Sequence, residues 1–173
     1  MRNSPRETVD LLLRRSALEV RRLIPALLQS GPSRFPIAPH AIRYLHHAIL
    51  ILQNRDAAVN NALLSLHATA SESEGPLLDF LDSSPDDPTS GRPFYDLDYA
   101  LRICKRNKRV QACVQIYSKM SLFESSVDLA LENGDIDLAQ TNADKPKEDD
   151  LLRKKLWLKI AKHVVRDKND IKA

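Results

Sequence analysis

The chain has 173 residues, of which 43% are hydrophobic and 28% charged, and its formal net charge is +3 at pH 7. A chain of this size and composition can bury a core and is not disordered by composition. The few aromatic residues disfavour an all-β sandwich, the four glycines leave no phosphate-binding loop, and no apolar run approaches the roughly 20 residues that span a bilayer.

The charges are distributed unevenly along the chain. Residues 1–75 hold nine arginines, no lysine and six acidic residues, whereas 17 basic and 17 acidic residues balance in the remainder. Because nucleic-acid binding needs a basic stripe on one face, this small excess predicts no nucleic-acid partner. No secretory signal opens the chain and only two cysteines occur, so we expect a cytosolic protein or one on the cytosolic face of a membrane.

Two short helices are predicted near the N-terminus. Ser4-Pro5-Arg6-Glu7 has the form of a capping box, and it precedes an apolar face made by Val9, Leu12 and Leu13. A second helix must begin or bend at Pro25, because an interior proline loses a backbone hydrogen bond. Gly31-Pro32 is expected to end that helix.

A helical hairpin is predicted next. One helix over 39–52 has Ile42, Leu45, Ile49 and Leu52 at helical spacing, and a second has Val59, Leu63, Leu66 and Ala70. A shorter helix is expected over 76–81. The following segment, 82–93, consists mostly of aspartate, serine and proline, and this composition predicts either a flexible loop or a tolerated surface insertion.

Helices are predicted closely spaced after residue 95. Asp96 is expected to cap a helix that carries Leu97, Leu101 and Cys104, and Val110, Cys113, Val114 and Tyr117 mark the next. Ser121-Leu122-Phe123-Glu124 reads as a second capping box, for a helix with Val127, Ala130 and Leu131 that stops at Asn133-Gly134. Asp135 should start a short helix through Ala139.

The last predicted helix runs from about Lys147 to Arg166. Its apolar positions form an unusually wide side, which indicates neighbours on two sides: Leu152, Leu156, Trp157, Ile160, Ala161 and Val164. Consecutive helices without strands favour an all-α fold, a right-handed α-solenoid of stacked antiparallel helix pairs like clathrin heavy-chain repeats. We expect residues 1–173 to form a single solenoid fragment excised from a longer one.

Candidate catalytic or metal-binding residues are few. Cys104 and Cys113 lie nine residues apart on apolar helix faces, which predicts buried packing thiols, with a disulfide as the alternative. His46 and His47 diverge around one helix, and ordinary surface or boundary positions are predicted for the single histidines His40, His67 and His163. We therefore predict no catalytic site, no metal site, no cofactor and no enzyme.

Trp157, the single tryptophan, could be an interface anchor, but its apolar neighbours favour core packing. Other residues that bind a protein partner cannot be selected from one sequence.

Several segments resemble the clathrin-heavy-chain-repeat region of class C vacuolar protein sorting subunits. They are YDLDYALRICKRN, QACVQIYSKMSLFESSVDLAL, DIDLAQTNAD and LLRKKLWLKIAKHVV, preceded by LIPALL, AIRYLHHAI and NALLSLHA. The resemblance covers nearly the whole chain and is most specific over residues 95–165. In the family a β-propeller precedes the solenoid and a RING domain follows it; neither is expected here, because the chain is helical and has no paired CxxC elements.

This resemblance implies a scaffold in the HOPS and CORVET tethering complexes, which act before membrane fusion at late endosomes and at vacuoles or lysosomes. The implied partners are other class C subunits, and SNAREs through the assembled complex, with only indirect membrane association. Two alternatives remain: another helical-repeat scaffold such as a vesicle-coat leg, and a nucleic-acid-binding helical repeat.

Overall fold

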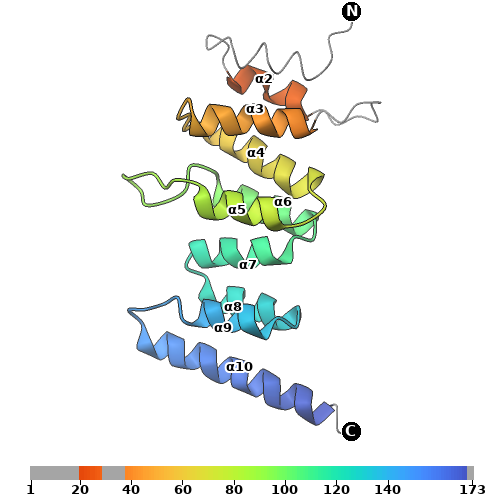
Figure 1. Ribbon diagram of the computed structural model, residues 1–173. Helices are drawn as coiled ribbons and strands as arrows, with labels where there is room; N and C mark the ends of the chain where they lie inside the picture. Colours follow the sequence, from red (N-terminus) through yellow and green to blue (C-terminus); the bar gives the residue numbers. More distant parts are fainter. Residues whose placement is uncertain (1–19, 29–37, 171–173) are drawn as a thin grey trace, which may run out of the picture. The chain divides into compact units, whose positions relative to one another are not determined.

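The computed structural model describes residues 20–28 and 38–170, which are helical apart from turns and one isolated bridge between Asp86 and Pro93 (Figure 1). The helices are α2 Val20–Leu28, α3 Ala38–Leu50, α4 Ala57–Ala70, α5 Gly75–Ser83, α6 Leu97–Arg106, α7 Val110–Lys119, α8 Phe123–Glu132, α9 Ile136–Ala143 and α10 Asp150–Asp170. The predicted all-α class is confirmed. The capping box at Ser4 and the stop at Gly31-Pro32 lie outside the described residues.

The chain divides into two compact units, Met1–Ile103 and Cys104–Ala173, with the division inside α6. In the first unit α2, α3 and α4 pack against one another, and α5 packs on α4. The predicted α3–α4 hairpin is present. Helix α2 continues through Pro25, so the alternative of a helix beginning there is wrong.

The buried face of the hairpin differs in part from the predicted one. Leu45, Val59 and Leu63 are fully buried, as expected. Leu52 is 49% exposed because α3 ends at Leu50, which leaves Leu52 in the turn. Ala70 is also exposed, at the last position of α4.

The segment 82–93 forms a local hydrogen-bonded turn. The amide of Asp87 donates to the carbonyl of Arg92 at 2.8 Å, and the amide of Gly91 donates to Asp87 at 2.7 Å. Gly91 has a φ of 64°, a left-handed conformation that favours glycine. Mobility of this segment remains a prediction.

In the second unit the helix starts recur every 13 residues, at Val110, Phe123 and Ile136. Each start follows a left-handed residue at the same interval, and their φ values are 56° for Lys108, 61° for Ser121 and 75° for Gly134. Such residues at helix C-termini belong to the Schellman turn. The same type of turn therefore connects the helices three times. Only the turn that contains Gly134 was predicted from the sequence.

The hydrogen bonds of these turns are the same in each case. After α7, the amide of Leu122 donates to the carbonyl of Tyr117 at 2.9 Å and that of Ser121 to Ser118 at 3.0 Å. After α8, Asp135 and Gly134 repeat this pattern, at 3.0 Å and 2.9 Å. Both pairs satisfy carbonyls that a helix end otherwise leaves without partners.

The capping box predicted at Ser121 is wrong. Ser121 is the left-handed residue that ends α7, and Leu122 occupies the N-cap of α8 without a side-chain hydrogen bond. The caps predicted at Asp96 and Asp135 are confirmed, since their carboxylates accept from the amides of Tyr99 at 3.1 Å and Leu138 at 2.9 Å.

The core of the second unit lies between α7, α8, α9 and α10. Helix α8 packs against α7 and α9, and α10 packs on α8 and α9 (Figure 1). Its buried members are Val114, Val127, Ala130, Leu131, Ala139, Ala143, Leu156 and Ile160. Three of them are alanines, and small side chains allow helix axes to approach closely.

Candidate interaction surfaces

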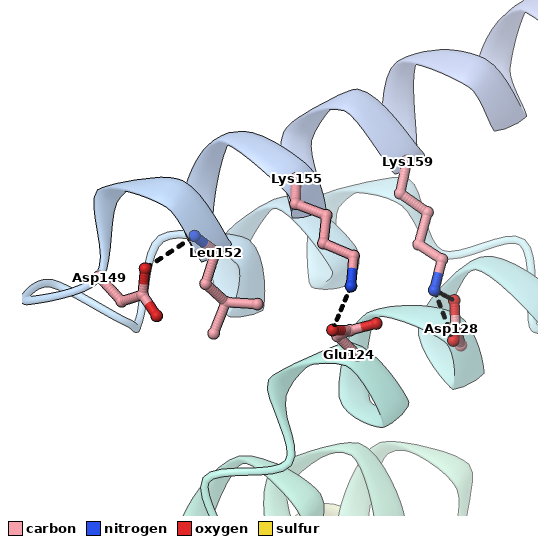
Figure 2. Close-up of polar contacts among 6 residues, drawn as sticks. All are labelled: Glu124, Asp128, Asp149, Leu152, Lys155 and Lys159. Atoms are coloured by element: carbon pink, nitrogen blue, oxygen red, sulfur yellow. Dashed lines mark hydrogen bonds and ion pairs between the residues drawn. The ribbon is translucent and has the colours of Figure 1, made fainter.

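Two ion pairs join α8 to α10 beside their apolar contact, and together they are called the ladder (Figure 2). Glu124 and Asp128 lie four residues apart on α8, and Lys155 and Lys159 lie four apart on α10. The Nζ of Lys155 is 2.7 Å from a carboxylate oxygen of Glu124, and that of Lys159 is 2.6 Å from Asp128. Residues four apart share one helix face, so the two helices meet along a charged edge beside their apolar contact.

Electrostatics at this edge favours the ionised carboxylate. The hydrogen bond from Lys155, together with its positive charge, lowers the pKa of Glu124 below its ordinary value. At the start of α10, Asp149 accepts from the amide of Leu152 at 2.9 Å, which caps the helix (Figure 2).

These ladder residues were not predicted from the sequence. The sequence predicts a capping-box role for Glu124 instead. The sequence does show two acidic residues four apart on one helix and two lysines four apart on another. It does not show that these two helices lie side by side, so the ion pairs could not be predicted from it.

Trp157 does not pack in the core, and that prediction is wrong. It is 38% exposed, and its indole Nε1 donates to the Asp144 carboxylate at 2.8 Å. On the same helix Leu156 is fully buried and Ile160 is 3% exposed. Trp157 therefore lies at the rim of the contact, where one ring edge reaches a polar partner.

The predicted wide apolar side of α10 is only partly covered. Leu156 and Ile160 are buried and Leu152 and Val164 partly buried against the core, whereas Ala161 is exposed. Further aliphatic side chains, which the prediction had not included, are exposed on the opposite face: Leu151 at 81%, Leu158 at 56% and Val165 at 58%.

In the first unit a cleft of about 350 Å³ lies beside the α3–α4 turn. The guanidinium of Arg55 lies 5.6 Å from the centroid of the Phe94 ring, a cation–π contact. The rest of the cleft is lined by both apolar and polar residues: Ile49, Leu50, Gln53, Asn54, Asn60, Ser83, Pro85, Asp86 and Pro88. Segment 82–93 thus contributes a wall of a cleft.

Two histidines meet inside the first unit. The Nε2 atoms of His46 and His67 are 3.0 Å apart, so one ring donates and the other accepts. Burial, followed by the charge of His46, lowers the pKa of His67 to about 4. His67 was predicted to have a surface or boundary position, but it is only 4% exposed and its ring lies against Phe80.

The remaining candidate residues form no cluster for chemistry. Cys104 and Cys113 are both buried thiols, as predicted. His163 lies 3.2 Å from Asp167 on the same helix, and His40 and His47 are half-buried. Within residues 20–28 and 38–170 no three His, Cys, Asp or Glu side chains gather as metal ligands, and none of the helices described there has the length and hydropathy to cross a membrane.

Comparison with known proteins places this helical chain in a family. Residues 1–165 match the family model described as VPS18, alpha-solenoid domain, second half. Vacuolar sorting protein 18 of Arabidopsis thaliana is 42% identical over 170 residues, which are 96% of this chain and 17% of that protein. Vacuolar protein sorting-associated protein 18 homolog of Danio rerio is 40% identical over 174 residues, 99% of this chain and 17% of that protein.

Vacuolar membrane protein pep3 of Schizosaccharomyces pombe is 36% identical over 171 residues, 97% of this chain and 18% of that protein. The chain thus spans about a sixth of the length of these relatives. The resemblance noted over residues 95–165 and the expected α-solenoid class are both confirmed. The chain therefore belongs to the VPS18 family, in which it matches the second half of the α-solenoid domain.

Proposed function

We propose that this chain is a non-catalytic scaffold segment of a vacuolar sorting subunit that acts in membrane tethering within HOPS and CORVET assemblies. The observation that carries the proposal is the match of nearly the entire chain to relatives named for vacuolar sorting. A repeat of short helices supports it, because helical repeats hold other proteins along long faces.

The partners of this segment are other class C subunits, and SNAREs are reached through the assembled complex. The protein acts on the cytosolic side of late endosomes and vacuoles or lysosomes, where the other subunits mediate membrane association. No enzyme activity and no cofactor is part of the proposal.

Affinity purification of the full-length protein tests this role. We expect the unmodified protein to co-purify with other class C subunits, and a variant lacking residues 95–165 to lose at least some of them. Shortening of segment 82–93 serves as the matched control, because that turn is local and should leave the assembly intact.

Two outcomes would contradict the proposal. One is co-purification with vesicle-coat subunits in place of class C subunits, which would favour the vesicle-coat alternative. The other is an unchanged assembly after removal of residues 95–165. Tight, salt-sensitive binding to RNA would instead favour a nucleic-acid-binding repeat.

A further inference from the structure

The cleft of the first unit lies between the α3–α4 turn and segment 82–93. Leu50 and Arg55 line it from the turn, and Pro85 and Asp86 line it from the segment, which Phe94 follows. Its volume of about 350 Å³ is near the lower end of ligand-binding clefts, which begin at about 300 Å³. A cleft of this size has room for a few side chains of a peptide.

Hydrogen bonds fix the walls of this cleft before any ligand binds. Gln53 has a left-handed φ of 48°, a conformation that persists in a residue other than glycine only where its surroundings fix it. The amide of Asn54 donates to the carbonyl of Ala48 at 3.0 Å, and the side-chain amide of Asn60 donates to the carbonyl of Asp56 at 3.0 Å. Segment 82–93 is held by its own turn, so both walls are formed in advance.

Large apolar side chains are exposed at this place. Leu50 is 59% exposed, and the two residues that follow it, Ile51 and Leu52, are 68% and 49% exposed. Phe94 is half-buried. Contiguous exposed apolar side chains are typical of binding surfaces, because covering them removes apolar area from water. A bulky apolar side chain in the cleft would cover part of Leu50 and Phe94.

Arg55 adds a cation to this apolar surface. Its guanidinium lies over the ring of Phe94, and within the described ranges of the chain no carboxylate lies at ion-pair distance from it. The carboxylate of Asp87 accepts from the amide of Thr89 instead, at 2.9 Å. An arginine presents donors that match a carboxylate. Because Asp86 also lines the cleft, a single carboxylate fits better there than a polyanion.

We propose that this cleft is a docking site for a short extended segment of another protein, in which a bulky apolar side chain packs beside Leu50 and Phe94 and a neighbouring carboxylate pairs with Arg55. A contact this small belongs to the weak, transient class of protein interface. The partner therefore binds and leaves without changing the stable composition of the assembly. The proposal does not depend on which assembly the chain joins.

The test begins with random peptides displayed on phage and selected on the full-length protein. Leu50→Ser protein serves as the competitor, which removes peptides that bind elsewhere. We expect the selected peptides to share a bulky apolar residue with an aspartate or glutamate beside it. One of them, synthesised with a fluorescent label, should bind Leu50→Ser protein at least about tenfold more weakly than the unmodified protein.

A second variant tests the charge of the peptide. Arg55→Gln should weaken binding of the labelled peptide by about fivefold, because the ion pair is partly exposed, and high salt should reduce that difference. Arg92→Gln is the matched control, since Arg92 is an exposed arginine of segment 82–93 that does not line the cleft. It should leave the affinity unchanged. Thermal unfolding checks that every variant is folded.

A selection that yields no peptide sensitive to Leu50→Ser would overturn the docking proposal, and an unchanged affinity in Arg55→Gln would overturn the acidic character of the ligand. Cysteine labelling tests what occupies the cleft in the absence of a partner. We expect Leu50→Cys in the full-length protein to react with a maleimide nearly as fast as in urea-unfolded protein. Slow labelling would assign the cleft to a segment of the same polypeptide, and labelling that slows as the protein concentration rises would assign it to a second copy. Either result would overturn the assignment to another protein.

Discussion

Ser126 joins two helices through a buried hydrogen bond. Its hydroxyl donates to the carbonyl of Val114 at 3.0 Å, and the residue is fully buried between α7 and α8. The Ser126 hydroxyl therefore gives the buried carbonyl of Val114 an additional hydrogen-bond donor.

We expect Ser126→Ala to lower the free energy of unfolding by about 1–2 kcal/mol, because it removes a buried hydrogen bond. Ser125→Ala is the control, since Ser125 is exposed on the same helix. Urea unfolding of both variants measures the difference, and equal midpoints for the two would contradict the assignment.

The His46–His67 pair predicts a dependence of stability on pH. The folded pKa of His67 is about 4, below the ordinary 6.5 of an exposed imidazole, so unfolding takes up a proton. The stabilisation is therefore complete above pH 6.5 and is lost as the pH falls toward 4, in total on the order of 3 kcal/mol.

Urea unfolding at a series of pH values from 7 to 4 would measure this loss. We expect His67→Gln to flatten the profile, and His47→Gln, next to the pair, to leave it unchanged. An unaltered profile in His67→Gln would show that other groups cause the acid sensitivity.

At the scale of the element, the 13-residue repeat makes a prediction about its turns. Ser121 has a left-handed φ of 61° without being glycine, whereas Gly134 occupies the equivalent position with φ 75°. A Cβ added to Gly134 meets no atom within 4 Å, so a substitution there changes only backbone strain.

We expect Ser121→Gly to raise the free energy of unfolding and Gly134→Ala to lower it, each by about 1 kcal/mol. Gly75→Ala is a control in ordinary helical geometry, where the new Cβ would lie 3.7 Å from the Ser73 hydroxyl oxygen, and it should be neutral or slightly stabilising. Changes of the same sign in Ser121→Gly and Gly134→Ala would contradict the equivalence of the turns.

The edge between α8 and α10 should show a measurable coupling. A double-mutant cycle with Asp128→Asn and Lys159→Met is expected to give about 0.2–1 kcal/mol at low salt, because both side chains are partly exposed. High salt should reduce it. A coupling of zero at low salt would show that the pair adds nothing to helix packing.

Helix positions were predictable because apolar residues recur with helical period. The stops were predictable only where glycine marked them, as at Gly134. The prediction at Ser121 failed because a serine followed three residues later by glutamate has the form of a capping box, whereas in the structure this serine is the left-handed residue that ends α7. A left-handed backbone conformation at a residue other than glycine cannot be predicted from the pattern of side chains.

Exposure on α10 was harder to predict than its helical structure. Trp157 and Leu156 are adjacent and both apolar, and only the placement of α8 and α9 decides which of them is buried. The ladder through Lys155 and the pairing of His46 with His67 have the same origin, since each joins residues at least 21 positions apart.

At the scale of the whole molecule, the exposed aliphatic side chains of α10, Leu151, Leu158 and Val165, predict weak self-association of the isolated 173-residue chain. Sedimentation should show concentration-dependent association, because three exposed aliphatic side chains lie along one face. Leu158→Lys should weaken it, whereas Leu122→Lys, another exposed leucine of the second unit, should not. A strictly monomeric and highly stable chain at high concentration would contradict this prediction.

Crosslinking of the intact native assembly, followed by mapping of the joined residues, tests the scaffold role most directly. The account predicts that lysines within residues 95–165 crosslink to other class C subunits. The account would be contradicted if this region crosslinked only within its own polypeptide, or if it crosslinked to vesicle-coat subunits instead of class C subunits.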